Sequence, residues 1–442
     1  MNLVYGVKDK PSFGKLLVFA FQQLLAILAA TIAVPAIIGN GMSHSAALFG
    51  AGVGTIVYQL FTKFKSPVFL GSSFAFIGSM FAAFAGSVST AAGYAGLILG
   101  ATFAGLVYVI LAIIVKFAGV NWINKLMPPV VIGPTVALIG LSLAGAAISD
   151  LQVGKVLVDG ASVASPYACI ICGLVTLAVV IICSVYGKKM TKLIPFIIGI
   201  VAGYVLATIL TLIGTYTSNP ALMIIDFSAF NNMQWYPDFT FLKALGGIKE
   251  IDAGYIATIA VAYIPVAFVV FAEHIADHKN LSTIIGTELL EEPGLHRTLL
   301  GDGIGSIAGA IFGGCPNTTY GESVGCVAIT GNASVITILT TAIIAIIASF
   351  VAPFVTFLAT IPNCVMGGVC ISLYGFIAVS GLKMIQQVNL NQNKNLFVVA
   401  VILITGIGGL TLTFGQITIT SIACALILGI LTNVLVSKAN EE

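Results

Sequence analysis

Three acidic residues stand in segments whose other residues are typical of lipid-buried helices. Glu273 and Asp277 lie within IATIAVAYIPVAFVVFAEHIAD, and Glu322 lies within NTTYGESVGCVAIT. An ionisable group inside a bilayer costs at least about 2.5–3.5 kcal/mol on insertion scales, so it marks a transport pathway or a binding site. Glu273 and Asp277 are four residues apart, which places both carboxylates on one helix face. Two close carboxylates in a poorly solvated site rarely both ionise, so this pair predicts a site that handles protons.

The composition is that of an integral membrane protein. Of the 442 residues, 59% are hydrophobic and 8% are charged, whereas a soluble domain has about 25% charged residues. The basic residues are scattered, so the net charge of +2 does not predict nucleic-acid binding. Cys169 and Cys172 form a CxxC inside an apolar stretch, without a second CxxC or a nearby histidine. We interpret them as small buried residues rather than a metal or redox site.

The apolar segments predict an all-α polytopic protein with about fourteen transmembrane segments, since each span needs about 20 apolar residues. These segments begin near residues 15, 44, 67, 91, 129, 166, 193, 252, 299, 318, 334, 362, 395 and 417. With the N-terminus inside, 15 of the 18 Lys and Arg residues fall on the cytoplasmic side, and only Lys155, Lys243 and Lys249 fall outside. The positive-inside rule therefore predicts that both termini are cytoplasmic.

Fourteen segments divide into two inverted repeats of seven, which many secondary transporters use. The third and tenth segments, SPVFLGSSFAFIGSM and NTTYGESVGCVAIT, are short and interrupted by polar residues and glycines, and we expect short extended strands there. Interrupted segments at corresponding positions predict a substrate site near the midplane, because non-helical backbone at that depth needs protein or water around it.

A ladder of glycines at four-residue spacing marks the ninth segment. It consists of Gly301, Gly305, Gly309 and Gly313. Small residues at this spacing let another helix approach closely. The segment GDGIGSIAG contains an element like GxGxxG, but neither a preceding strand nor a following acidic residue supports dinucleotide binding. We therefore interpret the ladder as a packing face.

The two interrupted segments indicate what kind of molecule they bind. The first offers backbone N–H groups around Ser73 and the aromatic ring of Phe74, and the second adds the carboxylate of Glu322. A flat polar ligand would stack on Phe74 and donate N–H groups to Glu273 and Glu322. A sugar would require more amide and charged side chains, and an inorganic anion would require a positive centre. The residues favour a neutral planar ring with N–H donors.

Several segments resemble the nucleobase–ascorbate transporter family, in its bacterial uracil permease branch. They are AEHIADH, EPGLHRTLLGDG, GGCPNTTYGESVGCVAITG, LGSSFAFIGS and VMGGVCISLYG. The family signature, which begins with Gln or Glu, maps onto residues 322–331. Glu at its first position resembles the uracil branch, whereas purine carriers typically have Gln. Two positions depart from the family pattern, because Ser323 replaces the usual Asn and Gln22-Gln23 replaces the frequent Gln-His.

The resemblance implies roles for individual residues. The substrate-binding residues would be Phe74, Glu273, Tyr320, Gly321 and Glu322. Glu273 and Glu322 would bind the pyrimidine, the backbones of Phe74 and Gly321 would donate to the ring carbonyls, and Tyr320 would support them. Glu273 and Asp277 would couple substrate to a proton.

Further residues are weaker candidates. Ser73, Ser323 and Tyr374 are secondary candidates for the site, and core packing explains Tyr374 equally well. His274 follows Glu273 but points to another helix face, so we expect it to be structural or water-facing. We expect His278 and His296 to be cytoplasmic and solvated.

The family also implies a core domain and a gate domain, each assembled from two chain segments. The core would comprise residues 1–120 and 251–358, and the gate residues 121–250 and 359–442. The expected function is proton-coupled uptake of uracil or a related nucleobase by alternating access, in the cytoplasmic membrane. The protein would be a homodimer in lipid, with the proton as coupling ion and without another cofactor, a metal or nucleic acid.

Other readings of the sequence remain. Within the family, the alternative is a purine or xanthine permease. The alternatives from other functional classes are a membrane-embedded enzyme and a passive channel. An enzyme needs a nucleophile–base pair or a metal cluster, and the few dispersed histidines offer neither. A channel does not need paired carboxylates that hold a proton.

Overall fold

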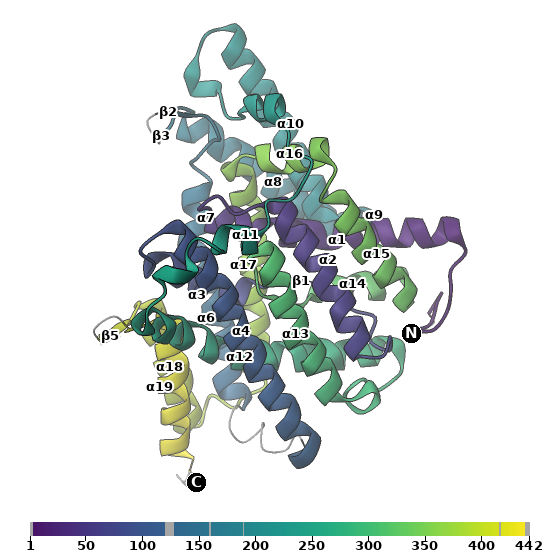
Figure 1. Cartoon of the computed structure of the whole chain (residues 1–442), viewed down its shortest axis with the longest axis vertical. Coiled ribbons are helices and arrows are strands. Elements are labelled where there is room, and N and C mark those ends of the chain that lie inside the picture. The colour runs from purple at the N-terminus through teal and green to yellow at the C-terminus, as the bar shows by residue number, and fades with distance from the viewer. Residues whose placement is uncertain (1–2, 120–127, 159–160, 189, 415–416, 438–442) are drawn as a thin grey trace.

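The computed structural model describes residues 3–119, 128–158, 161–188, 190–414 and 417–437 of a mainly helical protein (Figure 1). The helices of the first half are α1 (Phe13–Ile38), α2 (His44–Phe61), α3 (Ile77–Ala85), α4 (Thr90–Ala118), α6 (Pro129–Ser142), α7 (Ala144–Asp150), α8 (Pro166–Tyr186), α9 (Met190–Leu193), α10 (Pro195–Tyr216) and α11 (Thr240–Ala244). Those of the second half are α12 (Ala253–Ile285), α13 (Leu295–Gly313), α14 (Gly321–Thr330), α15 (Val335–Ala348), α16 (Ala352–Thr360), α17 (Asn363–Ile385), α18 (Asn393–Ile407) and α19 (Ser421–Val436).

Short strands and short helices connect these elements. The strands pair as β1 (Leu70–Ser72) with β4 (Asn317–Thr319), β2 (Leu157–Val158) with β3 (Ala161–Ser162), and β5 (Leu412–Phe414) with β6 (Ile417–Ile419). The short helices are η1 (Phe74–Phe76), η2 (Pro220–Leu222), η3 (Phe227–Asn232), η4 (Ile248–Glu250) and η5 (Leu290–Gly294).

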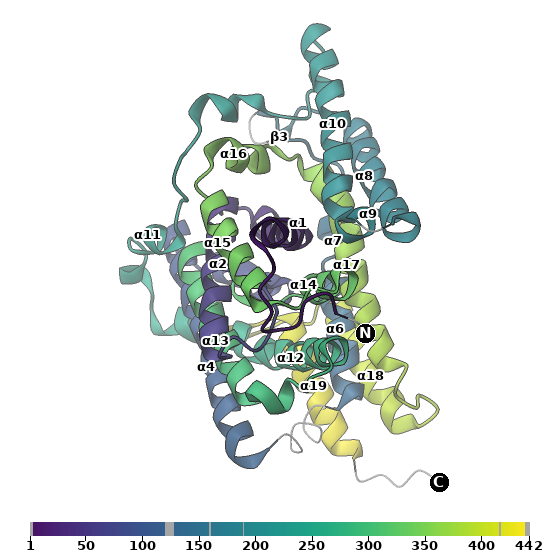
Figure 2. The same ribbon diagram turned by 90° about the vertical axis from the view of Figure 1, so that its right-hand side faces the viewer.

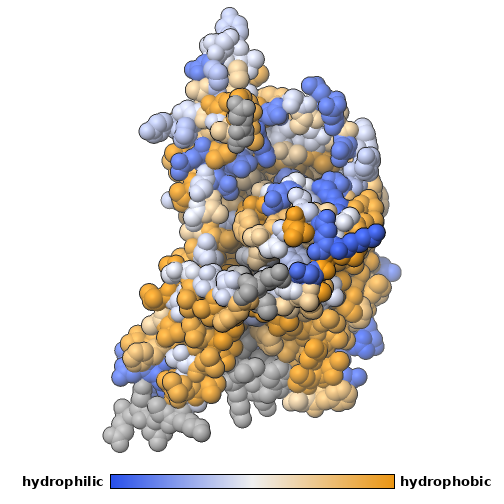
Figure 3. All heavy atoms as spheres, turned by 60° about the vertical axis from the view of Figure 1, so that its left-hand side comes forward, coloured by the Kyte–Doolittle hydropathy of each residue, from blue (hydrophilic) through white to orange (hydrophobic). Residues whose placement is uncertain are grey.

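The helices are those of a multi-pass membrane protein. Among the described residues, seven helical segments are long and apolar enough to cross a membrane: α1, α4, α6 together with α7, α8, α10, α12 and α17. The pair of α15 and α16, bent by 84°, adds an eighth, and α18 and α19 are shorter apolar helices. Much of the lower half of the face shown in Figure 3 is hydrophobic, as a lipid-facing surface requires. The count of fourteen spans stays a prediction.

The helices pack in two groups that each combine both halves of the chain. In the first group, α13 packs against α2 and α4, α12 against α4, and α15 against α1 and α2. In the second, α17 packs against α6 and α8, α8 against α10, and α18 against α19 and α6. Figure 2 shows α2, α4 and α13 on one side and α8, α10 and α18 on the other. The predicted domain boundary at residue 120 lies outside the described residues.

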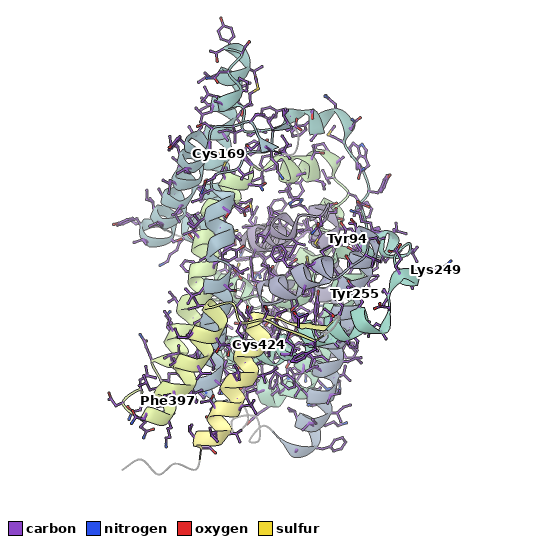
Figure 4. The ribbon with its side chains drawn as sticks, turned by 90° about the vertical axis from the view of Figure 1, so that its left-hand side faces the viewer. Tyr94, Cys169, Lys249, Tyr255, Phe397 and Cys424 are labelled. Carbon is purple, nitrogen blue, oxygen red and sulfur yellow. The ribbon has the colours of Figure 1, made fainter. Side chains whose placement is uncertain are left out.

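Labelled side chains in Figure 4 illustrate the two groups. Tyr94 of α4 and Tyr255 of α12 lie in the first group, and the Tyr255 hydroxyl donates to the carbonyl of Ala83 at 2.7 Å. Cys169 of α8 lies in the second group, where its thiol is free and buried. In the part of the chain that the structure describes, no cluster of His, Cys, Asp and Glu could hold a metal ion.

The glycine ladder of α13 packs against α2, which confirms its interpretation as a packing face. A Cβ atom built on Gly50 of α2 would lie 2.5 Å from the carbonyl oxygen of Gly309, and one built on Gly309 would overlap the side-chain amide of Asn317. That amide donates to the carbonyl of Gly50 at 3.1 Å. The close approach of α2 and α13 therefore places β4, which begins at Asn317, beside both helices.

Gly309→Ala should destabilise the protein, because the added methyl group must displace the Asn317 side chain. Overpacking of this kind typically costs about 1–3 kcal/mol, so the thermal unfolding midpoint of the purified protein should fall. Gly375→Ala is the matched control, since nothing lies within 4 Å of a Cβ atom at that position. Equal midpoints for the two variants would contradict the close packing of α2 and α13.

Candidate functional site

Strands β1 and β4 form an antiparallel pair that packs against α2 and α13, and Figure 1 shows β1 beside these helices. Leu70 lies opposite Thr319 and Ser72 lies opposite Asn317. All residues of both strands are buried. Each strand leads into a helix, since β1 is followed by η1 and α3, and β4 is followed by α14. The two segments that the sequence marks as interrupted therefore meet in space, although the helices from α3 to α13 lie between them along the chain.

Side chains from α2 and α14 form hydrogen bonds with the non-helical backbone that leads into β1. Gln59 Nε2 donates to the carbonyls of Ser66 and Val68 at 2.7 and 3.1 Å. The N–H of Phe69 donates to Ser323 Oγ at 2.9 Å. An unpaired backbone group would be costly here, because Ser66, Val68 and Phe69 are all buried. These contacts explain how a non-helical segment persists within the helix bundle.

Tyr320 lies across β1 and joins the two interrupted segments. Its hydroxyl donates to the carbonyl of Ser72 at 2.8 Å, and its N–H donates to the carbonyl of Phe69 at 3.2 Å. A Cβ atom built on Gly71 would overlap the Tyr320 ring. The glycine at this position is therefore required by the close approach of the ring, and Tyr320 holds β1 beside the start of α14.

A cavity of about 410 Å³ lies between the two groups of helices. Its first wall carries most of the polar groups and consists of Ser73, Phe74, Ala75, Glu273, Ala276, Asp277, Thr318, Thr319, Tyr320, Gly321 and Glu322. Its second wall is apolar apart from one serine and consists of Val136, Ile139, Phe196, Leu373, Phe376, Ile377, Ser380 and Met384. A ligand in the cavity would therefore contact polar groups on one side and apolar side chains on the other.

All three acidic residues that stand in apolar segments of the sequence line this cavity. Glu273 and Asp277 lie on α12, and Glu322 lies in the first turn of α14. Asp277 Oδ2 accepts a hydrogen bond from Thr319 Oγ1 at 2.9 Å, which ties α12 to β4. The N-terminus of a helix favours negative charge, so the position of Glu322 suits a carboxylate. No positively charged side chain lines the cavity among the described residues.

Two helices also begin at the cavity. Phe74 is the first residue of η1 and Gly321 the first residue of α14, and both line the cavity. The first N–H groups of a helix have no acceptor within that helix. The site thus combines carboxylate acceptors, backbone donors and the Phe74 ring. This set matches a planar ligand that has both N–H groups and carbonyls, and it lacks the positive charge that an anion would need.

Two of the secondary candidates lie outside the cavity lining. Ser323 is fully buried behind Glu322, where its Oγ also accepts from Gln23 Nε2 at 2.5 Å. The two departures from the family pattern are therefore in direct contact. Tyr374 is buried and packs edge-on against Phe74, with ring centroids 6.0 Å apart. It therefore contacts the Phe74 ring from α17, which belongs to the second group of helices.

The sequence did not predict the apolar wall of the cavity or the role of Asp302, and it predicted the wrong environment for His278. The apolar wall gives no signal, because residues such as Val136 and Met384 resemble any lipid-facing residue. Asp302 is an acid within the apolar α13, so the rule that singled out Glu273 would also have found it. Its carboxylate lies 2.6 Å from His274 Nδ1. The expectation that His278 is solvated was wrong, since only 1% of the residue is exposed.

The chain is similar to known transporters in sequence. Residues 14–415 match the family model described as Permease family. The chain is 39% identical over 437 residues to the uracil permease of Bacillus caldolyticus, covering 98% of this chain and 94% of the relative. It is 36% identical over 445 residues to the uracil permease of Bacillus subtilis, covering 99% and 96%. It is 33% identical over 427 residues to the uracil permease of Escherichia coli K12, covering 96% and 92%.

Solved structures share the fold at low sequence identity. The transmembrane domain of the cyanobacterial bicarbonate transporter BicA has a TM-score of 0.61 and 16% identity, covering 97% of this chain and 100% of that chain. The murine anion transporter Slc26a9 in its inward-facing state has a TM-score of 0.64 and 12% identity, covering 97% and 69%. The fold is therefore one that membrane transporters use.

Proposed function

Because this chain belongs to the Permease family, with relatives named uracil permeases over nearly its whole length, we propose that it carries uracil across the cytoplasmic membrane together with a proton. One observation carries the proposal: Glu273 and Glu322 share a cavity with the helix starts at Phe74 and Gly321. Uracil is flat and has two N–H groups and two carbonyls. The carboxylates accept from the N–H groups, and the helix starts donate to the carbonyls.

The division of the cavity walls supports alternating access. We propose a core of residues 1–120 and 251–358 and a gate of residues 121–250 and 359–442, arranged as two inverted repeats of seven segments with both termini cytoplasmic. The strands β1 and β4 and the carboxylates of the cavity belong to the core. The gate contributes Phe196, Phe376 and other apolar side chains, with Ser380 as its polar residue. The apolar character of this gate wall favours movement of the core against it. Two copies would pair through their gates.

The paired acids of α12 supply the proton coupling. Glu273 and Asp277 are one helical turn apart, and both line the cavity. Two anions so close in a site that excludes water repel each other, so the pair takes up a proton when the cavity closes over uracil. Thr319 of β4 donates a hydrogen bond to Asp277 at 2.9 Å. Protonation of the Asp277 carboxylate therefore changes a hydrogen bond to β4, the strand that precedes Tyr320. The proton is the only coupling ion in this proposal.

Uptake into reconstituted vesicles tests the proposal. Labelled uracil should accumulate when an inward proton gradient is imposed, and a protonophore should abolish the accumulation. Xanthine in the same assay tests a purine carrier. Accumulation that requires sodium and ignores the protonophore, or preferential accumulation of xanthine, would overturn the assignment. Equilibration without accumulation would indicate a passive channel.

Phe74→Ala should weaken uracil binding through lost stacking, while the dependence of uptake on the proton gradient stays unchanged. Stacking of a base on an aromatic side chain contributes roughly 1–3 kcal/mol in other proteins, so we expect the Kd to rise by about five- to a hundredfold. Phe74→Tyr is the control, since it keeps the aromatic face. Calorimetry on the purified variants measures both. Equal affinity of Phe74→Ala and the unaltered protein would contradict stacking.

A further inference from the structure

Two buried histidines lie on the back of α12, away from the cavity. His274 and His278 are one turn apart, their rings stack with centroids 4.1 Å apart, and at most 1% of either residue is exposed. The proposed transport mechanism uses neither residue. His278 directly follows Asp277, so a single helical turn presents a carboxylate to the cavity and an imidazole to the interior.

The hydrogen bonds of His278 define which nitrogen is the acceptor. Its Nδ1 lies 2.8 Å from the carbonyl oxygen of His274. A carbonyl only accepts, so Nδ1 must carry a hydrogen. In the neutral ring, Nε2 is then the acceptor. The hydroxyl of Tyr58 lies 2.7 Å from Nε2, a contact that links α12 to α2.

Tyr58 also contacts the segment that leads into β1. Its hydroxyl donates to Ser66 Oγ at 2.7 Å, and Ser66 Oγ lies 3.4 Å from His278 Nε2. Ser66 begins the non-helical run 66–70. Tyr58 and Ser66 are both fully buried. The run continues through β1 to Phe74, which lines the cavity. The backbone therefore connects the contact between Tyr58 and His278 to Phe74.

Two consecutive residues of α12, Asp277 and His278, thus contact the two interrupted segments that contain β4 and β1. Asp277 accepts from Thr319 of β4 at 2.9 Å. His278 holds the approach to β1 through Tyr58 and Ser66. The two strands are themselves paired, with Leu70 opposite Thr319. We propose that Tyr58 and His278 are positioning residues that set the place of β1 and Phe74 relative to α12, and so the affinity for the substrate.

This inference rests on the proposed function, because the affinity for uracil reports the position of Phe74. A merely structural role predicts a different result. If Tyr58 and His278 only fill the core, their variants lower the unfolding temperature but leave the Kd of the folded protein unchanged. If they position Phe74, the Kd rises as well.

Paired substitutions at position 278 separate the two ring nitrogens. His278→Gln places its amide where Nε2 lies and keeps the contact with Tyr58, whereas His278→Asn places its amide near Nδ1 and loses that contact. Loss of a buried hydrogen bond that leaves its partner unsatisfied should raise the Kd for uracil roughly five- to tenfold in Tyr58→Phe and His278→Asn. His278→Gln should stay within about twofold of the unaltered protein, since its bond is kept.

Tyr108→Phe is the matched control. Tyr108 is 1% exposed, and its hydroxyl has no hydrogen-bond partner among the residues that the structure describes. Removal of that hydroxyl should leave the Kd unchanged. The double variant Tyr58→Phe/His278→Asn should bind no more weakly than either single variant, because both remove the same contact.

Calorimetric titration of uracil into each purified full-length variant, with thermal unfolding measured in parallel, completes the test. An unchanged Kd in Tyr58→Phe, or equal effects of Gln and Asn at position 278, would overturn the proposal. If the unaltered protein binds no uracil, the proposed function fails instead. Thermal destabilisation that is not additive between Tyr58→Phe and His278→Asn would then still support the contact, and additive destabilisation would refute it.

Discussion

Glu322→Gln is expected to weaken uracil binding about ten- to a hundredfold in a protein that still folds. The carboxylate lines the cavity in the first turn of α14, where it accepts an N–H of the ring. Gln keeps the shape but presents an amide with its own N–H donors. The lost charge-assisted hydrogen bond contributes about 1.5–3 kcal/mol, which gives the expected change in Kd. Calorimetric titration of the purified variant measures it.

Glu291→Gln is the control for this substitution. Glu291 is exposed in the connector between α12 and α13, so the same chemical change there should not alter the Kd. A Glu322→Gln protein that unfolds at the normal temperature and binds uracil with the affinity of the unaltered chain would exclude Glu322 as a ligand.

Asp277→Asn should abolish accumulation of uracil while binding persists. Asn has nearly the same shape and still accepts from Thr319 Oγ1, which now lies 2.9 Å from the carboxylate, but it cannot take up a proton. With one proton per uracil, a gradient of one pH unit supports roughly tenfold accumulation, since about 1.4 kcal/mol corresponds to a factor of ten. The variant should only equilibrate uracil across the vesicle membrane.

Exchange of internal for external labelled uracil is the control for Asp277→Asn, because it requires a working site but no net proton movement. We expect exchange to continue in the variant. Accumulation to the level of the unaltered protein would show that Asp277 does not couple transport to the proton gradient.

Much of the site could be predicted because its signals are local. An acid in an apolar helix is unusual by itself, so Glu273, Asp277 and Glu322 stand out without any knowledge of the fold. The interruption of the third and tenth segments by glycines and polar residues is equally local, and strands β1 and β4 lie in those segments. The spacing of the α13 glycines likewise predicted a close helix contact, which α2 provides.

The rest depends on contacts between distant parts of the chain. His278 has a position on α12 that the helical period predicts, but only the fold shows that Tyr58, 220 residues away, covers it. The contact between Gln23 and Ser323 spans 300 residues. The apolar wall of the cavity is built from residues that look like lipid contacts in the sequence. Burial against protein and burial in lipid select the same side chains, so composition does not separate them.

A structure of this protein with uracil bound tests the central claim most directly. We expect uracil in the cavity between the two groups of helices, within hydrogen-bond distance of Glu273 and Glu322 and with its ring stacked on Phe74. Uracil bound elsewhere, beyond the reach of all three side chains, would contradict it.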